Sequence, residues 1–406
     1  MKLSLRLTIA TGIGLVLGIL LPLGGGDTLA LFDVLERIIV SIGRYVVFPL
    51  VFFSVAIGVY ELWYENKLHT LGLSILALIP GAALLGSFVG TLGFAIFRPE
   101  RIPIIIKEGE VLQLPDALDL IERIFPSNVF EIFVRDSGYL LPVLVAGILL
   151  GLAFHFPKGH AGPSLELFDS LSRILFRVAH YIIEFMALGF IVLGAYRMLQ
   201  LRETTDLDLF QSLFFLIFGL VGFMTFVLYP LILFSLGGKK NPFSWLRGTF
   251  LPLLASVLSG DTYFVLPFLS RLGKEHHKIP RKVGVMAYPL SILFGRSGSA
   301  MVIGVSFLAI LQSYSSLELT LGQYLWVFAG SFGVSFLLVG VPSSGALIGL
   351  ALLSGWYGQG LEEGYLILLP AAPFLIGAGV FLDVLTASVV GILAARWNKL
   401  EMKHIS

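Results

Sequence analysis

Three ionisable side chains stand alone in long apolar segments of the second half of the sequence. Arg296 is the only Asp, Glu, Lys or Arg between residues 283 and 317, Asp261 is the only one in 248–270, and Asp383 is the only one in 364–395. A charge at the bilayer centre costs about 2.5–3.5 kcal/mol on insertion scales, so such residues face protein or an aqueous cavity. Three solitary charges in neighbouring segments therefore predict a common polar centre.

Arg296 offers the chemistry best suited to a carboxylate, because a guanidinium presents a planar fork of donors that can bind both carboxylate oxygens. Its neighbours within Gly295–Ser299 are glycines and serines. An unwound turn of such small residues would offer carbonyls and hydroxyls to a ligand. Two interpretations stay open: contact with a substrate or coupling ion, and a structural ion pair of Arg296 with Asp383 or Asp261.

Two interruptions of apolar sequence carry further candidate groups. Asp261 follows Gly260, where it can bind a ligand or simply cap the helix that follows. Pro342 breaks the second apolar segment, as the hinge of a gate or as a plain kink, and the amides after it would favour an anion. The predicted substrate-binding residues are Arg296, Ser297, Ser299, Ser259, Asp261, Thr262, Ser343, Ser344 and Gly345, with Asp383 and Arg296 as the charge-compensating pair.

Composition defines the class of protein that positions these residues. The 406 residues are 57% hydrophobic and 13% charged, against about 25% charged in an average soluble domain. Apolar runs long enough to cross a bilayer recur from end to end, which predicts an all-α polytopic membrane protein. The net charge of +1 argues against a nucleic-acid partner. Without cysteine, disulfides and thiolate metal sites are excluded, and no cofactor or metal is expected.

Continuous membrane spans are expected at about 5–23, 38–60, 71–97, 138–156, 165–199 and 208–236. The N-terminal stretch is interpreted as an uncleaved first span rather than a secretory signal, because no clear small-x-small cleavage site follows it. Basic residues gather in "NKLH", "GGKKNPFSWLRG", "RLGKEHHKIPRK" and "RWNKLEMK", whereas the acid-rich segment 100–136 falls on the other side. The positive-inside rule then places both termini of this multi-pass protein of the cell membrane in the cytoplasm.

Two apolar segments are interrupted in the middle, 248–270 by "SGDT" and 319–361 by "VPSSG". Each half holds about 9–17 apolar residues and, at 1.5 Å per residue, reaches only partway across a bilayer. This predicts two re-entrant hairpins whose tips line a cavity, as in secondary transporters built from internal repeats. Two kinked ordinary spans are the alternative.

Other ionisable residues in apolar or basic stretches carry weaker signals. Glu184 is an intramembrane acid that would serve as a proton site or an interhelical bond. His276 and His277 lie in a basic loop, where solvated histidines are expected rather than a metal site. The spans contain no His-Glu-x-x-His or Gly-x-Ser-x-Gly pattern, so an enzyme is not expected.

Several motifs, in order and over nearly the whole chain, resemble those of the dicarboxylate/amino acid:cation symporters, the glutamate-transporter family. "VVFPLVFFSVAIGV" is similar to the second span of that family, "FPSNVFEIF" to the start of its fourth, and "KKNPFSWLRG" to the approach to its first hairpin. "GVPSSGALIGLAL" resembles its second hairpin tip, and Pro289–Gln312 aligns without gaps to its seventh span. The resemblance implies eight transmembrane helices plus two re-entrant hairpins, an elevator-type transporter with scaffold and transport domains, and a homotrimer.

The same resemblance implies a division of the chain. The expected parts are scaffold helices 1–2 at 1–70, helix 3 of the transport domain at 71–97, helices 4–5 of the scaffold and trimer interface at 98–199, helix 6 of the transport domain at 200–237, the first hairpin at 248–272, helix 7 at 281–316, the second hairpin at 322–360 and helix 8 at 362–397.

The positions that hold sodium and substrate in this family are changed here. The family's Asn-Met-Asp-Gly-Thr in the seventh span becomes Gly295–Ser299, so its Asn and Asp are gone and Arg296 replaces its Met. Its third-span sodium ligands correspond to Ile79, Ala82 and Ala83. In the eighth span its substrate-binding Arg, amino-binding Asp and sodium-ligating Asn correspond to Leu375, Ala372 and Gly379, and of that set only Asp383 remains.

These departures predict a secondary transporter of a small organic anion, of the dicarboxylate or acidic amino acid class, that works by an elevator mechanism. It would not be coupled to sodium, because Arg296 places a fixed cation where the ion would bind. Loss of the amino-binding aspartate favours a plain carboxylate unless Asp261 has taken over that contact. The alternatives are a sodium-coupled symporter with rearranged sites and, from another class, an anion channel.

Overall fold

The computed structural model of the chain describes residues 3–22, 26–104, 117–134, 138–155, 158–203, 207–237, 241, 243–315 and 318–400. Within these ranges the regular elements are all helices, and eight helical stretches are long and apolar enough to cross a membrane. This confirms the predicted all-α polytopic class. Residues 105–116 and 135–136 of the acid-rich segment used to assign the membrane sides lie outside the described ranges.

The described residues of the first half of the chain form eight α-helices. They are α1 (Leu3–Leu20), α2 (Gly26–Arg44), α3 (Val47–Tyr64), α4 (Leu68–Phe97), α5 (Ala117–Glu122), α6 (Glu131–Val134), α7 (Leu141–Ala153) and α8 (Lys158–Glu203).

The second half contains more and shorter elements. They are η1 (Leu207–Phe210), α9 (Gln211–Phe223), the π-helical turn η2 (Met224–Leu228), α10 (Tyr229–Leu236), α11 (Ser244–Ser259), α12 (Thr262–Glu275), α13 (Arg281–Phe294), α14 (Ser297–Tyr314), α15 (Leu321–Leu337), η3 (Leu338–Gly340), α16 (Gly345–Tyr357), η4 (Gly364–Ala371) and α17 (Ala372–Trp397).

Two predicted spans differ from the helices that form. The span expected at 38–60 is divided between α2 and α3, and α2 already begins at Gly26. Charged residues such as Asp33 and Arg37, which form an i,i+4 ion pair, interrupt the apolar pattern there without interrupting the helix. The span expected at 138–156 is the 13-residue α7. The helical stretch Leu321–Gly340, the first arm of the second interrupted segment, is instead one of the eight of spanning length.

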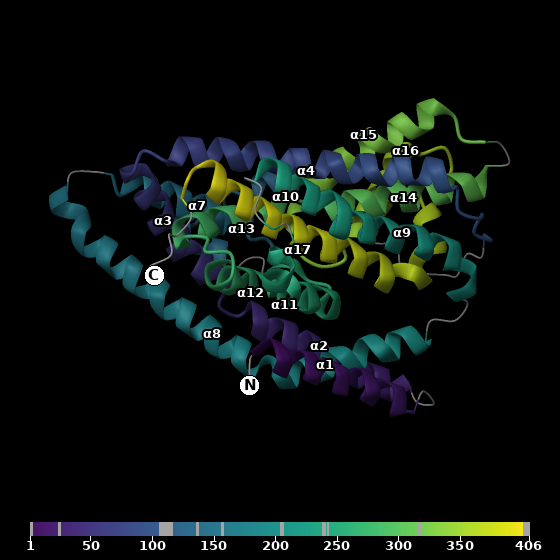
Figure 1. Cartoon of the computed structure of the whole chain (residues 1–406), viewed down its shortest axis with the longest axis horizontal. Helices are drawn as coiled ribbons and strands as arrows, with labels where there is room; N and C mark the ends of the chain where they lie inside the picture. The colour runs from purple at the N-terminus through teal and green to yellow at the C-terminus, as the bar shows by residue number, and fades with distance from the viewer. Residues whose placement is uncertain are drawn as a thin grey trace.

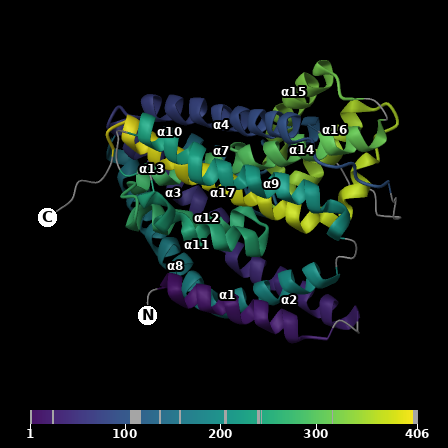
Figure 2. The ribbon, with the colours of Figure 1, turned by 45° about the vertical axis from the view of Figure 1, so that its right-hand side comes forward.

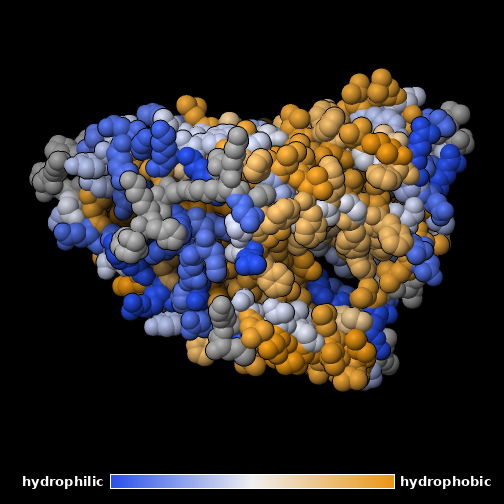
Figure 3. All heavy atoms as spheres, viewed as in Figure 1, coloured by the Kyte–Doolittle hydropathy of each residue, from blue (hydrophilic) through white to orange (hydrophobic). Residues whose placement is uncertain are grey.

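The helices run roughly parallel to the long axis of the molecule in two groups (Figures 1 and 2). One group contains α1 and α2, which pack against the long α8. The other contains α4, α9, α10, α14 and α17, and the hairpin formed by α11 and α12 lies between the two groups. A broad apolar surface covers much of the molecule between two more hydrophilic ends, as embedding in a bilayer requires (Figure 3).

The pair α13 and α14 is the centre of the second group. In an 18-residue apolar part of the helical stretch Arg281–Tyr314, 94% of the residues are buried, against 28% in Leu3–Leu20, which is α1. A helix that neighbours surround completely can hold polar groups in a defined geometry, because those neighbours must satisfy each buried donor and acceptor. The polar centre lies on this pair.

Candidate functional site

Arg296 lies in a break of the central helix pair. α13 ends at Phe294 and α14 begins at Ser297, which leaves Gly295 and Arg296 outside regular helix. The side chain of Arg296 is 0% exposed and is the largest of the fully buried side chains. Its Nη2 donates to the carbonyl oxygens of Leu338 at 3.3 Å and Val341 at 2.8 Å. The break in the central helix therefore meets the break between α15 and α16.

Asp383 of α17 is the ion-pair partner of Arg296. Its Oδ2 lies 3.6 Å from Arg296 Nη1 and accepts a hydrogen bond from Ser299 Oγ at 2.6 Å. Its Oδ1 accepts from the amides of Gly298 at 2.7 Å and Ser299 at 3.0 Å, so the carboxylate also caps α14. Three hydrogen bonds and one guanidinium offset the desolvation of this 1% exposed carboxylate.

A close helix approach makes this arrangement possible. An added Cβ at Gly298 would lie 2.3 Å from the carbonyl oxygen of Gly379, so α14 and α17 touch through backbone at this level. That contact brings the first amides of α14 within hydrogen-bonding distance of Asp383. Only a residue without a side chain fits at position 298.

Arg296 keeps donors that make no hydrogen bond to a described residue. Its Nε and Nη1 are buried and have no hydrogen-bond partner there. The first residue of α16 is next to them, since an added Cβ at Gly345 would lie 3.9 Å from Nη1 and 3.6 Å from Ser299 Oγ. A buried donor without a partner costs about 1–3 kcal/mol. Free guanidinium donors beside a helix N-terminus form an arrangement that can bind an anionic oxygen.

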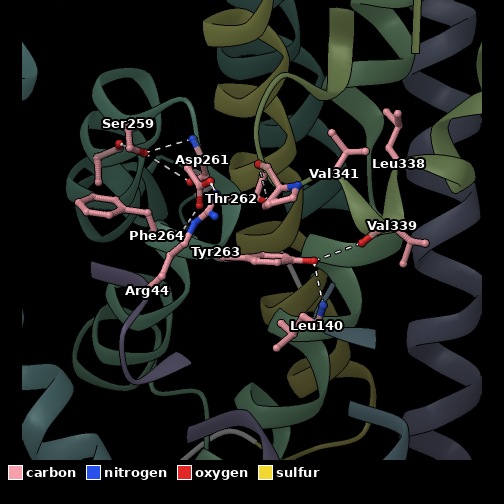
Figure 4. Close-up of polar contacts among 12 residues, drawn as sticks. Arg44, Leu140, Ser259, Asp261, Thr262, Tyr263, Phe264, Leu338, Val339 and Val341 are labelled. Carbon is pink, nitrogen blue, oxygen red and sulfur yellow. Dashed lines mark hydrogen bonds and ion pairs between the residues drawn. The ribbon is translucent and has the colours of Figure 1, made fainter. Parts of the chain in front are cut away.

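Asp261 belongs to a different contact. Its Oδ1 accepts from the amide of Phe264 at 2.7 Å, which caps α12, and its Oδ2 forms an ion pair with Arg44 at the end of α2. Figure 4 shows Arg44 reaching toward Asp261 from the neighbouring helix group. Of the two sequence interpretations of Asp261, the structure contains the helix cap. Of the two candidate partners of Arg296, the structure contains Asp383 and not Asp261.

The tips of the two interrupted segments touch each other (Figure 4). Both the amide and the hydroxyl of Thr262 donate to the carbonyl oxygen of Pro342, at 3.0 and 3.1 Å. Tyr263 donates from its hydroxyl to the carbonyl oxygen of Val339 at 3.2 Å and accepts from the amide of Leu140 at 3.3 Å. The remaining polar group of the first tip, Ser259 Oγ, donates to Ala255 within its own helix at 2.8 Å.

The predicted site residues thus divide into two neighbouring sets. Arg296, Ser299, Gly345 and Asp383 form one cluster. Ser297 follows Arg296 in the chain, but its hydroxyl accepts a 3.3 Å hydrogen bond from Tyr229, outside the cluster. Ser259, Asp261 and Thr262 occupy the first tip, which contacts the second tip at Pro342. In the second tip Ser344 has a φ of +60°, and Ser343 is exposed.

Four site residues carried no signal in the sequence. They are Arg44, Arg197, Tyr229 and Tyr263. Arg197 of α8 donates from Nε to the carbonyl oxygen of Leu258 at 2.8 Å, so a second arginine from the α1–α2–α8 group holds the first tip. A tyrosine in an apolar span looks the same whether it faces lipid or a partner. The partners of these arginines lie 61 and 217 residues away along the chain.

The weaker candidates lie away from this centre. The Glu184 side chain is 48% exposed and its Oε1 is 3.8 Å from His180 and 3.9 Å from Arg271, distances of loose ion pairs. His277 is not a solvated loop residue as expected, because its Nε2 lies 3.3 Å from Thr249 Oγ1 and its ring covers Gly248. Burial lowers the pKa of His277 from 6.5 to about 4.

Replacing His277 by glutamine is expected to flatten the acid side of the stability profile. Between pH 6.5 and 4 the unfolded chain takes up a proton at this residue and the folded chain does not. The stability due to His277 is therefore complete above pH 6.5 and falls toward pH 4, by at most about 3 kcal/mol. Melting temperatures of the detergent-solubilised variant across this range check it, with His276→Gln, in the exposed neighbour, as the control. If the melting temperature of His277→Gln fell with pH as steeply as that of wild type, the lowered pKa of His277 would be contradicted.

Broken helices whose turns meet a buried ion pair in a polytopic bundle define a transporter class of membrane protein. Comparison with known sequences gives the family. Residues 3–397 match the sodium:dicarboxylate symporter family. The chain belongs to this family; it is a membrane transporter and not an enzyme.

Individual relatives are distant. The chain is 24% identical over 98% of its length to the proton/glutamate-aspartate symporter of Bacillus subtilis, of which it covers 95%. It is 23% identical to the C4-dicarboxylate transport protein of the same organism, covering 98% of this chain and 94% of the relative. Human excitatory amino acid transporter 3 is 25% identical over 54% of this chain and 41% of its own length.

Proposed function

We propose that the chain is a secondary transporter of a small organic anion and that Arg296 binds the substrate carboxylate. The observation that carries the proposal is the pair of buried Arg296 donors, Nε and Nη1, that have no hydrogen-bond partner in the described chain. One ion-pair contact to Asp383 at 3.6 Å leaves hydrogen-bonding capacity that a ligand oxygen would satisfy. The backbone of Gly345, at the start of α16, supplies the other side of this position.

Transport is proposed to be independent of sodium. Ile79, Ala82 and Ala83 have no side-chain oxygen for a cation, and the oxygens of Asp383 already accept three hydrogen bonds. A sodium ion within about 4 Å of the guanidinium would meet a repulsion of about 4 kcal/mol at an effective dielectric constant of 20. Arg296 thus supplies a permanent positive charge in place of a mobile one, and the carrier works with protons, by facilitation or by exchange.

The substrate is proposed to be a plain dicarboxylate rather than an amino acid. An α-ammonium group needs an acceptor of negative charge, and both central carboxylates are already engaged. Asp261 pairs with Arg44 and caps α12, and Asp383 pairs with Arg296. Relatives with names of both substrate classes match the chain, so the engaged state of these two carboxylates is what supports the dicarboxylate.

The mechanism is proposed to be an elevator in a homotrimer of the cell membrane with cytoplasmic termini. The scaffold, here α1, α2, α3, α5, α6, α7 and α8, holds the first tip by contacts from Arg44, Arg197 and Leu140. The other helices, with both hairpins, form the moving part. Phe185 and Leu188 of α8 are 79% and 75% exposed and fit a subunit interface on the scaffold.

Uptake into proteoliposomes tests the function. We expect labelled succinate or malate to enter at equal rates with and without a sodium gradient, and faster than aspartate or glutamate. Uptake only with sodium would favour a sodium-coupled symporter with rearranged ligands. Preference for aspartate would contradict the proposal that Asp261 and Asp383 are already engaged and cannot bind an α-ammonium group. Anion currents far above carrier turnover would identify a channel.

A further inference from the structure

A groove of about 650 Å³ runs along the outside of the molecule between α4 and α9. Each wall is one helical stripe, with residues such as Val89, Gly93 and Phe97 on α4 and Ser212, Gly219 and Phe223 on α9. Intervals of three and four residues keep such positions on one face of a helix. Two stripes therefore face each other across the groove.

The groove has no means of recognising a polar ligand. Of its twelve lining residues only Ser212 has a polar side chain, and the hydroxyl of Ser212 already accepts a hydrogen bond from the amide of Glu100 at 3.0 Å. Both walls belong to helical stretches of membrane-spanning length and hydropathy. Phe97 and Phe215 are 69% and 70% exposed, so the groove opens outward. Its occupant must be apolar.

The dimensions of the groove select a narrow occupant. From Ser212 to Phe223 the stripe is about 17 Å long at 1.5 Å per residue, close to one leaflet of a hydrocarbon core about 30 Å thick. An extended hydrocarbon chain of one leaflet matches this length and lies along both helical stripes at once.

The two ends of the groove suit a lipid tail that points from the membrane surface toward the bilayer centre. One end lies where α4 finishes at Phe97 and α9 begins, beside the charged residues Arg98 and Glu100. The other end, at Val89 and Phe223, lies inside the apolar stretches of both helices. A lipid with its head group at the interface would place one tail along the full length of the groove.

We propose that the groove between α4 and α9 is a binding site for one acyl chain of a membrane phospholipid. Gly219 provides the test, because an added side chain there meets no atom within 4 Å and would project into open space. Gly219→Leu therefore fills the groove without disturbing the packing. Gly81→Leu is the matched control, since Gly81 of α4 also has open space around it and does not line the groove.

Native mass spectrometry of the three proteins, released from phospholipid nanodiscs, measures retained lipid and oligomeric state together. Wild type and Gly81→Leu are expected to retain lipid, and Gly219→Leu to retain at least five-fold less with the same oligomeric mass. Equal retention in all three proteins overturns the proposal. Loss of oligomer without loss of lipid in Gly219→Leu also overturns it and assigns the groove to a second copy.

A second readout does not depend on the variant folding. A phospholipid with a diazirine in its acyl chain is expected to label 89–97 and 212–223 of the wild-type protein more strongly than the other exposed apolar helix faces. These two segments should be labelled as strongly in the Gly81→Leu protein as in wild type, and more weakly in the Gly219→Leu protein. Uniform labelling of all exposed faces overturns the proposal.

Discussion

Arg296→Met is expected to turn the carrier into a protein that sodium stabilises and that transports only in the presence of sodium, with weaker substrate binding because the guanidinium contact to the carboxylate is lost. Without the guanidinium, Asp383 remains buried with three hydrogen bonds and no counter-charge. Removing one partner of a buried ion pair costs about 3–5 kcal/mol. A small cation that enters the vacated space offsets that cost.

The measurement is the melting temperature of the solubilised variant in sodium chloride and in choline chloride at equal ionic strength, followed by uptake under the same conditions. Wild type should melt at the same temperature in both salts, and Arg296→Met should melt several degrees higher in sodium. Arg173→Met is the control, because Arg173 is 73% exposed, pairs with Asp169 at 2.8 Å, and such pairs contribute about 0–1 kcal/mol.

Two other results have different meanings. If Arg296→Met folds, ignores sodium and is inactive in every salt, only the proposed contact of Arg296 with the substrate is supported, and the proposal that the arginine replaces the ion is wrong. The double variant Arg296→Met, Asp383→Asn separates charge from packing, since it removes both charges and should recover most of the lost stability. If the double variant stays as unstable as Arg296→Met, the lost stability comes from the cavity left by the arginine and not from the unpaired carboxylate.

The sequence predicted the polar centre because charged residues are rare in its apolar segments. A charge such as Arg296 or Asp383 in an uninterrupted apolar segment is costly in lipid, so its position alone indicated a buried partner. The distance of 3.6 Å between these two groups supports that reasoning. The choice between Asp383 and Asp261 could not be made, because both were solitary acids in neighbouring segments. It depends on how α14 and α17 approach each other at Gly298.

The contacts of the first tip were not predictable in the same way. Arg44 stands at the end of a helix that already contains other charges, so nothing marks it as the partner of Asp261. The early start of α2 was missed for a related reason. Its charged residues interrupt the apolar pattern, while the backbone remains helical because intrahelical hydrogen bonds do not depend on side-chain polarity.

Cross-linking α2 to the first tip is expected to stop transport completely and reversibly. An added Cβ at Gly43 would lie 2.3 Å from the Phe264 ring, so cysteines at 43 and 264 stand within range of a disulfide. The chain contains no cysteine of its own, and removal of the phenyl ring makes room. An elevator must break the contacts of Arg44, Arg197 and Leu140 with this hairpin in each cycle, and a covalent bond would prevent that.

The matched control joins two helices of the proposed scaffold. An added Cβ at Gly147 of α7 would lie 3.3 Å from Val55 Cβ of α3, so Val55→Cys, Gly147→Cys should oxidise and continue to transport. Uptake by Gly43→Cys, Phe264→Cys should fall to background after oxidation and return after reduction with dithiothreitol. If the oxidised protein transports as fast as the same protein after reduction with dithiothreitol, the first hairpin does not leave the proposed scaffold. The anion then crosses a fixed structure, as the channel alternative requires.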